Sequence, residues 1–385
     1  MREMTAERAV RSRRKRGYYD YNLLAVVIIL ICFGLMMLYS ASAYEASNTF
    51  GDDMYYFGRQ AVISAGAVAM ALIVSRIDYH VFMKWSPLLY VLALVLMAMV
   101  KFTPLGVSAG GARRWLNLGM QFQPSEIAKI AVILFIPYVI LKMGKQAKRA
   151  KATVVLLVLG LLQAGEAYLF TENLSTAIII MAISCVIIFL SHPRTRPFLL
   201  ILLIAAAVIA AVLFFLYQNV ESSTDFRLNR VLTWLHPEDH QDSGGYQVLQ
   251  ALYAIGSGGF FGKGLGNSTQ KLTRIPEAQN DMIFSIVCEE LGLFGAIILL
   301  LLFGYLLYRL FFIAQNAPDL YGTLIVSGIF AHIALQVILN ICVVLNVIPT
   351  TGVTLPFVSY GGTSILFLMA EIGVALGVAR RIRLE

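Results

Sequence analysis

Apolar residues occur along this chain in long runs that short polar stretches separate. A helix needs ~20 apolar residues to cross the hydrocarbon of a bilayer, because each residue rises only about 1.5 Å. Ten runs meet that standard, at residues 23–43, 58–75, 86–101, 124–142, 152–170, 174–191, 198–217, 282–308, 322–345 and 361–379. The pattern predicts an all-α polytopic membrane protein with ten transmembrane helices.

The fifth and sixth runs form the one ambiguous pair, since only Thr171, Glu172 and Asn173 lie between them. A single helix over both runs would extend ~60 Å, about twice the thickness of the hydrocarbon. We therefore expect two helices here.

Composition and charge agree with a membrane protein. Hydrophobic residues make up 59% of the chain and charged residues 14%, whereas about a quarter of the residues in a soluble domain are charged. With the N-terminus inside, cytoplasmic segments hold 20 of the 30 Lys and Arg residues, many of them in the tail and in Lys142–Lys151. This asymmetry follows the positive-inside rule and predicts that both termini are cytoplasmic. The net charge of +8 thus reports topology, and it does not indicate nucleic-acid binding.

The predicted organisation is a basic cytoplasmic tail (1–22), a membrane domain (23–380) and a short cytoplasmic tail (381–385). The first apolar run ends at Ala41-Ser42-Ala43, which resembles a signal-peptidase site. That run is long for a signal peptide, and nine further spans need no cleaved signal, so we favour a retained anchor.

Two external loops are long. Lys101–Gln123 is rich in glycine, which disfavours a regular helix, and Pro124 suits the first turn of the span that follows. The second loop, residues 218–280, lies between the seventh and eighth helices. Its apolar stretch Tyr246–Ile255 predicts a short helix on the membrane surface.

Charged residues inside apolar spans are candidates for function, because burying a charge in lipid is costly. Glu126 and Lys129 are three residues apart and share a helix face. They form either a structural ion pair or the lining of an external cavity that positions a polar substrate. Glu289 and Glu290 lie ~12 Å further along the eighth span than Asp281, and we expect them to hold helices together.

Asp281 stands where the long polar loop enters the eighth span. An acid at this junction is placed where water, membrane surface and a lipid-borne substrate meet. The alternative interpretation is a helix N-cap, because Asn280 and Asp281 directly precede an apolar run.

External basic residues gather in the same two loops. Arginine suits bidentate recognition of phosphate, so an anionic lipid headgroup is the ligand class that these residues predict. The candidates for substrate binding are Arg113, Arg114, Lys271 and Arg274.

Two other patterns are weaker. The glycine-rich stretch Gly256–Gly266 fails the Walker pattern, although its backbone amides could cradle a pyrophosphate. A metal site at His236 and His240 is less favoured than a solvated acidic loop, so no metal site is predicted.

Three segments resemble the SEDS family (shape, elongation, division and sporulation proteins), and they look more like its FtsW branch than its RodA branch. They read GARRWLNLGMQFQPSEIAK (111–129), IPEAQNDMIFSIVCEELGLFG (275–295) and IPTTGVTLPFVSYGGTS (348–364), and Tyr19–Ser42 also fits. The chain departs from the family pattern at two places. Glu172-Asn173-Leu174-Ser175-Thr176 stands where many relatives read PDLGT, and Gln279-Asn280-Asp281 stands where His-Thr-Asp is familiar.

The resemblance implies a ten-helix peptidoglycan glycosyltransferase of the bacterial cytoplasmic membrane. Such an enzyme polymerises lipid II on the outer face, with a class B penicillin-binding protein (a transpeptidase) and other divisome or elongasome membrane proteins as partners. Asp281 maps onto the essential acid of the family. Glu126 and Lys129 map onto residues that line the same cavity, and Arg113 and Arg114 fall in the matching basic motif.

The resemblance implies no tightly bound cofactor, but it leaves a divalent cation, Mg²⁺ or Mn²⁺, open. Division, elongation and sporulation roles also stay open. Two rival functions are a lipid II flippase, which would need a site near the midplane that is reachable from both sides, and a non-catalytic scaffold for a transpeptidase.

Overall fold

The computed structural model describes residues 19–109, 112–117, 119, 121–192, 203, 207, 226–239, 244–271, 275 and 278–383. Its long helices are α2 (Tyr21–Phe50), α3 (Tyr55–Val74), α4 (Tyr79–Phe102), α5 (Pro124–Met143), α6 (Ala150–Leu169), α7 (Leu174–Ser191), α11 (Ile283–Gln315) and α12 (Leu320–Val344). A short 3₁₀ turn, η1 (Gly144–Lys148), extends α5, and α13 (Ser364–Ala379) is a shorter apolar helix. Within the described residues, eight helices are long and apolar enough to cross a membrane. The predicted span 198–217, apart from residues 203 and 207, and the tail up to residue 18 lie outside the described residues.

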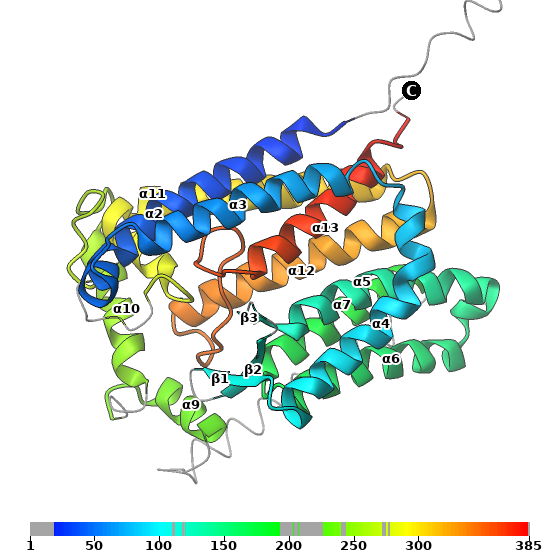
Figure 1. The fold of residues 1–385 in the computed structure, drawn as a ribbon, viewed down its shortest axis with the longest axis horizontal. Coiled ribbons are helices and arrows are strands. Elements are labelled where there is room, and N and C mark those ends of the chain that lie inside the picture. Colours follow the sequence, from blue (N-terminus) through cyan, green and yellow to red (C-terminus); the bar gives the residue numbers. More distant parts are fainter. Residues whose placement is uncertain are drawn as a thin grey trace, which may run out of the picture.

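The helices form one bundle with α12 near its centre (Figure 1). α12 packs against α5, α7, α11 and α13. Of its most apolar 18 residues, 67% are buried, which is the largest share among the described spans. α2 and α3 pack on α11 and α13, while α4 and α6 pack on α5 and α7. The central position of α12 makes it the element that connects the two sides of the bundle.

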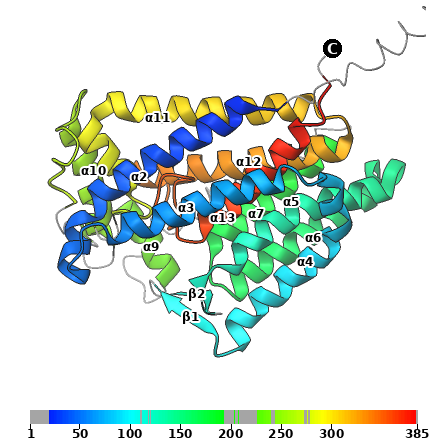
Figure 2. The same ribbon diagram turned by 45° about the horizontal axis from the view of Figure 1, so that its top comes forward.

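One end of the bundle carries the remaining elements, opposite the end where the C-terminus lies (Figures 1 and 2). These are the helices α9 (Phe226–Leu235) and α10 (Gly245–Gly258) and the strands β1 (Gly106–Ala109), β2 (Ala112–Asn117) and β3 (Gln121–Phe122). The strands form an antiparallel sheet in the order β1-β2-β3, with Val107 opposite Trp115. The sequence predicted neither this sheet nor α9, whereas α10 covers the short helix expected at Tyr246–Ile255.

The break between α6 and α7 is confirmed, and local chemistry explains it. Glu172 has a positive φ of 51°, which an α-helix cannot accommodate. The Asn173 side chain then caps α7 by accepting a hydrogen bond of 3.1 Å from the backbone N–H of Thr176. Pro124 opens α5 in its first turn, as predicted.

α11 is two helical segments joined at Gly292, where φ is 69° and ψ is −168°. The break leaves backbone groups without helical partners, and the loop after α10 supplies replacements. The amides of Lys263 and Gly264 donate to the carbonyls of Glu289 and Glu290, both at 2.9 Å. These two amides belong to the glycine-rich stretch that could cradle a pyrophosphate, and their engagement by α11 removes them from that role.

The end of the bundle that carries the C-terminus is held by charged pairs. Arg309 of α11 contacts Asp20 at 2.6 Å, and Arg381 contacts Asp78 at 2.6 Å. Burial acts to raise the pKa of Asp78, but hydrogen bonds from His80 and the charge of Arg381 outweigh it and hold that pKa below its usual value. These contacts fix the loops at the end assigned to the cytoplasm.

Candidate active site

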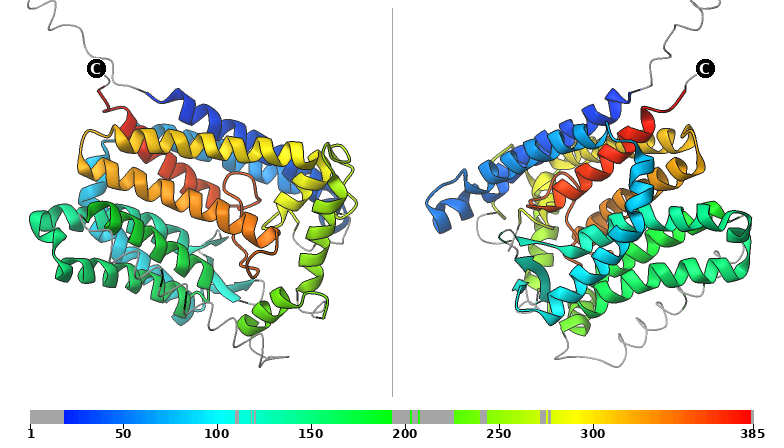
Figure 3. Two further views of the ribbon diagram at one scale, coloured as in Figure 1. Left: turned by 180° about the vertical axis from the view of Figure 1, so that it is seen from behind. Right: turned by 45° about the vertical axis from the view of Figure 1, so that its right-hand side comes forward.

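The loop between α12 and α13, residues 346–363, folds back into the bundle at the end that carries the sheet, α9 and α10 (Figure 3). Leu355, Phe357 and Val358 are buried there. Two amides of α12 bind its backbone: Gln336 donates to the carbonyl of Thr354 at 3.2 Å, and Asn340 donates to that of Val353 at 2.8 Å. The loop is therefore anchored to the central helix.

α9 places an arginine on this loop. Arg230 donates to the carbonyl of Thr350 at 3.3 Å, and Trp234, one turn later, donates to that of Asn346 at 2.9 Å. Arg114 of β2 reaches the same region, since its Nη1 lies 3.9 Å from the position that a Cβ on Gly352 would occupy. Two guanidinium groups from distant parts of the sequence thus meet at one short stretch of loop.

Asp281 joins this group from the turn before α11. Its carbonyl accepts a hydrogen bond of 2.7 Å from Asn340. Burial lowers the pKa of Arg230, and the negative charge of Asp281 counteracts that shift, so the two side chains interact electrostatically. The structure therefore brings Asp281, Arg230 and Arg114 to the same loop.

The N-cap interpretation of Asp281 is wrong. α11 begins at Ile283, Met282 occupies the cap position, and no side chain there accepts a hydrogen bond from the first turn.

Two of the predicted basic residues, Arg113 and Lys271, have other positions. The Arg113 guanidinium donates to the carbonyls of Lys101, Thr103 and Gly106 at 3.3, 2.5 and 3.2 Å, which closes the base of the sheet. Lys271 contacts Glu290 at 2.7 Å, and its side chain is 8% exposed. Arg274 lies outside the described residues.

Glu126 and Lys129 form the expected ion pair, with 2.9 Å between Nζ and Oε2. Both residues are buried, with exposures of 7% and 2%. They lie near the start of α5, on the other side of α12 from α11. Their role in substrate binding remains a prediction.

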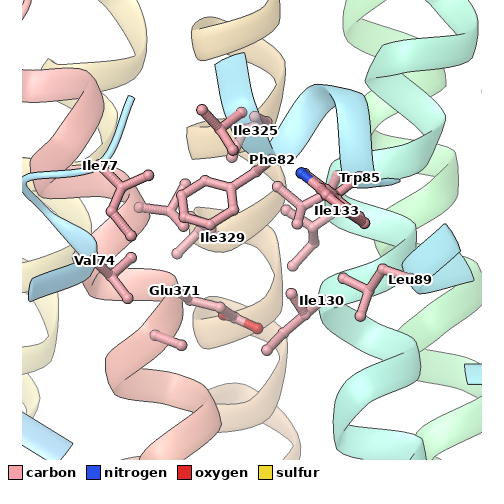
Figure 4. A pocket seen from close by; sticks show the side chains of 14 residues that line it. Val74, Ile77, Phe82, Trp85, Leu89, Ile130, Ile133, Ile325, Ile329 and Glu371 are labelled. Carbon is pink, nitrogen blue, oxygen red and sulfur yellow. The ribbon is translucent and has the colours of Figure 1, made fainter. Parts of the chain in front are cut away.

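An apolar cavity of about 410 Å³ lies between α3, α4, α5, α12 and α13. Figure 4 shows the Glu371 carboxyl on its wall, across from Ile130, among branched aliphatic and aromatic side chains. Glu371 also contacts His332 at 2.8 Å. The residues of α5 that line it are Ile130, Ile133 and Leu134, and neither member of the ion pair is among the lining residues. Asp281 is not among its lining residues.

The donors around Asp281 do not fit a resident divalent cation. Mg²⁺ and Mn²⁺ favour several oxygen ligands, with carboxylates among them. Within the described ranges no group of three or more His, Cys, Asp or Glu side chains could hold a metal ion, and the guanidinium of Arg230 is a cation that acts on Asp281. We derive no step through a metal.

Sequence reasoning missed two residues of this site. Arg230 is a basic residue of the external loop, and its spacing of four from Trp234 was the signal that both face the same way on a short helix. Asn340 is a polar residue inside a predicted span and is 0% exposed. The rule that polar groups in lipid are functional candidates applies to amides as well as charges.

Comparison with known proteins agrees with the motifs. Residues 20–384 match the family of cell cycle proteins FTSW_RODA_SPOVE. The stage V sporulation protein E of Bacillus subtilis is 36% identical over 369 residues, which cover 95% of this chain and 98% of that protein. A probable peptidoglycan glycosyltransferase FtsW of Trichlorobacter lovleyi is 36% identical over 374 residues, which cover 95% and 94% of the two chains.

Solved structures share the fold. A chain of a peptidoglycan synthase complex, studied for the coordination of polymerization and crosslinking, matches with a TM-score of 0.77 and 28% identity, covering 95% of this chain and 99% of that one. The rod shape determining protein RodA of Thermus thermophilus matches with a TM-score of 0.67 and 27% identity, covering 95% and 98%. The chain therefore belongs to the FtsW, RodA and SpoVE family of cell cycle proteins, as its motifs predicted.

Proposed function

We propose that this protein is a peptidoglycan glycosyltransferase that polymerises lipid II on the outer face of the bacterial cytoplasmic membrane. The observation that carries the proposal is the meeting of Asp281, Arg230 and Arg114 at the 346–363 loop. An acid beside two guanidinium groups suits a reaction that removes a proton and releases a pyrophosphate. The names of the FtsW relatives support the same activity.

Asp281 acts as the general base in this proposal. Its carboxylate takes the proton from the 4-hydroxyl of the acceptor N-acetylglucosamine. The electron pair left on that oxygen attacks the anomeric carbon of the donor. The bond from that carbon to the phosphate oxygen breaks, and undecaprenyl pyrophosphate leaves with the electron pair. The positive charge of Arg230 favours the ionised carboxylate, which is the form that accepts a proton.

The guanidinium groups stabilise the leaving group. Negative charge develops on the pyrophosphate as the bond breaks, and fixed cations in a partly water-excluded site stabilise it strongly. Arg114 and Arg230 are placed for this task by β2 and α9. Arg113 is a weaker candidate than its neighbour, because its guanidinium already binds three carbonyls.

The lipid tails and the headgroups of the substrate would contact different parts of the helical bundle. The isoprenoid tails stay in the bilayer, while both headgroups meet at the end of the bundle that carries Asp281. Glu126 and Lys129 bind polar substrate groups at the external end of α5. We propose that the apolar cavity beside α5 accepts hydrocarbon from the side of the bundle.

A class B penicillin-binding protein is the proposed partner. The match to a chain of a synthase complex that couples polymerization to crosslinking supports this pairing. The partner would crosslink the strands that this protein makes.

The test is glycan-chain formation from labelled lipid II by the purified full chain, with and without the partner. Asp281→Asn should lower turnover about 10²–10⁴-fold, which is the usual contribution of a general base. Size-exclusion profile and apparent Tm should stay at wild-type values. Near-normal turnover of the folded variant would remove the catalytic role of Asp281.

The same experiment separates the rival functions. If folded wild-type protein with bound partner makes no polymer, a flippase or a scaffold becomes the better interpretation. Transfer of labelled lipid II across vesicles then distinguishes these two.

A further inference from the structure

Asn340 of α12 makes two hydrogen bonds with one amide nitrogen. Its Nδ2 donates to the carbonyl of Asp281 at 2.7 Å and to the carbonyl of Val353 at 2.8 Å. The residue is 0% exposed, so water does not compete for either bond. A single side chain thus connects the turn that carries the acid with the loop that receives the arginines.

The geometry of the amide shows which of its groups matter. Both N–H groups are used, while Oδ1 is buried and has no hydrogen-bond partner in the described part of the chain. An unsatisfied buried acceptor costs about 1–3 kcal/mol. The opposite orientation would point Oδ1 at two carbonyls, which would repel it. The donors therefore decide the orientation.

Both ends of the connection touch the proposed machinery. Val353 is three residues from Thr350, whose carbonyl binds Arg230. Two residues before Asp281, the carbonyl of Gln279 accepts a hydrogen bond of 2.9 Å from the amide of Tyr360, at the other end of the same loop. The turn is held against the loop at two points, and Asn340 makes the contact at the acid itself.

We propose that Asn340 is a positioning residue that fixes Asp281 relative to the guanidinium groups. This inference rests on the proposed function. A carboxylate displaced by about 1 Å can lose about 10²-fold in rate, because proton transfer and attack need close alignment. Asn340 acts through the backbone of Asp281 and touches no substrate.

Gln336 supplies a matched control. It lies four residues earlier on α12 and donates to the carbonyl of Thr354 at 3.2 Å. Its Oε1 is also buried without a hydrogen-bond partner among the described residues. Gln336 therefore anchors the same loop to the same helix by one amide, but its bond does not go to Asp281.

The experiment measures kcat and KM for labelled lipid II with the full chain and its partner. Asn340→Leu, which removes both donors at similar volume, should lower kcat about 10–10²-fold and change KM less than about threefold. Gln336→Met should keep kcat within about threefold of wild type. An equal fall of kcat in both variants would overturn the proposal, because loop anchoring alone would then explain it.

A double-mutant cycle tests the route through Asp281. In the Asp281→Asn background, Asn340→Leu should cause no further fall in kcat, because the group that it positions is already gone. If the fold losses in kcat from the two substitutions multiply, Asn340 acts independently of the acid, and the proposal fails. If Asn340→Leu does not fold, Asn340→Ser, which keeps one hydroxyl donor, should give an intermediate kcat, and wild-type kcat there would also reject the idea.

Failure of the proposed function looks different from failure of this inference. Wild-type protein that forms no polymer from lipid II removes the function. Active wild-type protein together with fully active, folded Asn340 variants removes the positioning role alone.

Discussion

Asp281 and the pair Glu289 and Glu290 lie within ten residues of one another, but the fold gives them different surroundings. Glu289 and Glu290, at the end of the first segment of α11, are 0% exposed. Glu289 accepts hydrogen bonds from Lys263, Ser268, Thr269 and Gln270, and Glu290 accepts from Lys271, Ser40 and Ser268. Asp281 is only partly buried, and its backbone carbonyl accepts a hydrogen bond from Asn340.

The difference separates two acids whose carboxylates hold the structure together from the acid that is proposed as the general base. The carboxylates of Glu289 and Glu290 are occupied by ammonium, hydroxyl and amide groups of the 263–271 loop and of α2. Asp281 is held at the main chain, while its side chain lies in the field of Arg230. A general base needs a fixed position and access to the substrate, and the partly buried Asp281 is the one of these three acids proposed for that role.

The largest effect on stability should come from the structural acids. Glu290→Gln leaves the Lys271 ammonium, 8% exposed, without its anionic partner. Breaking a buried ion pair on one side costs about 3–5 kcal/mol, because the remaining charge stays desolvated. We expect a clear fall in apparent Tm in detergent, with residual activity per folded molecule close to wild type.

Asp53 provides the matched control for Glu290. It is an exposed acid at the same end of the bundle and accepts a hydrogen bond of 3.0 Å from Tyr39. Asp53→Asn should change stability by less than about 0.5 kcal/mol. If Glu290→Gln instead kept its Tm and lost turnover, the division between structural and chemical acids drawn above would be wrong.

The next effect concerns the partner of the chemical acid. Arg230→Gln should lower kcat about 10²-fold, which is typical of removing one electrostatic stabiliser of the transition state. Arg230→Lys keeps the positive charge but loses the planar guanidinium. Its kcat should therefore lie between those of wild type and Arg230→Gln. Turnover of labelled lipid II measures both variants.

Lys101→Gln serves as the control for Arg230. This exposed cation at the end of α4 donates to the carbonyl of Leu169 at 3.1 Å, away from the 346–363 loop. Its loss should leave kcat within about twofold of wild type. Equal losses from Lys101→Gln and Arg230→Gln would point to the general positive potential of this face and away from a specific site.

Local patterns in the sequence predicted most helices and the break between α6 and α7. Apolar run length identified the described spans, and the polar break at Glu172 and Asn173 was enough to separate α6 from α7. These features depend on residues close in the chain, which is why hydropathy and capping rules find them. The family motifs identified Asp281 without showing its surroundings.

Long-range contacts account for what the sequence did not predict. Lys271 carries an ammonium group that could bind phosphate, but in the structure it donates a hydrogen bond to Glu290, nineteen residues away. Arg113 and Arg114 are adjacent and look equivalent, yet strand alternation sends one to the carbonyls at the base of the sheet and the other towards Gly352. Asn340 and Asp281, 59 residues apart, meet only because α12 packs against α11.

Among the buried acids, the smallest effect on stability is expected at Glu126, which pairs with Lys129. This pair is buried like Glu290 and Lys271, and its proposed role in substrate binding comes from the resemblance to the family. Replacing both charges together by Glu126→Gln and Lys129→Met should keep the free energy of unfolding within about 1 kcal/mol of wild type, because no unpaired charge remains. Binding of lipid II should still weaken about tenfold or more, since a hydrogen bond to a charged group contributes about 1.5–3 kcal/mol. A stable double variant that binds and polymerises lipid II like wild type would place this pair with the structural acids, and Asp281 would remain as the acid that acts on substrate.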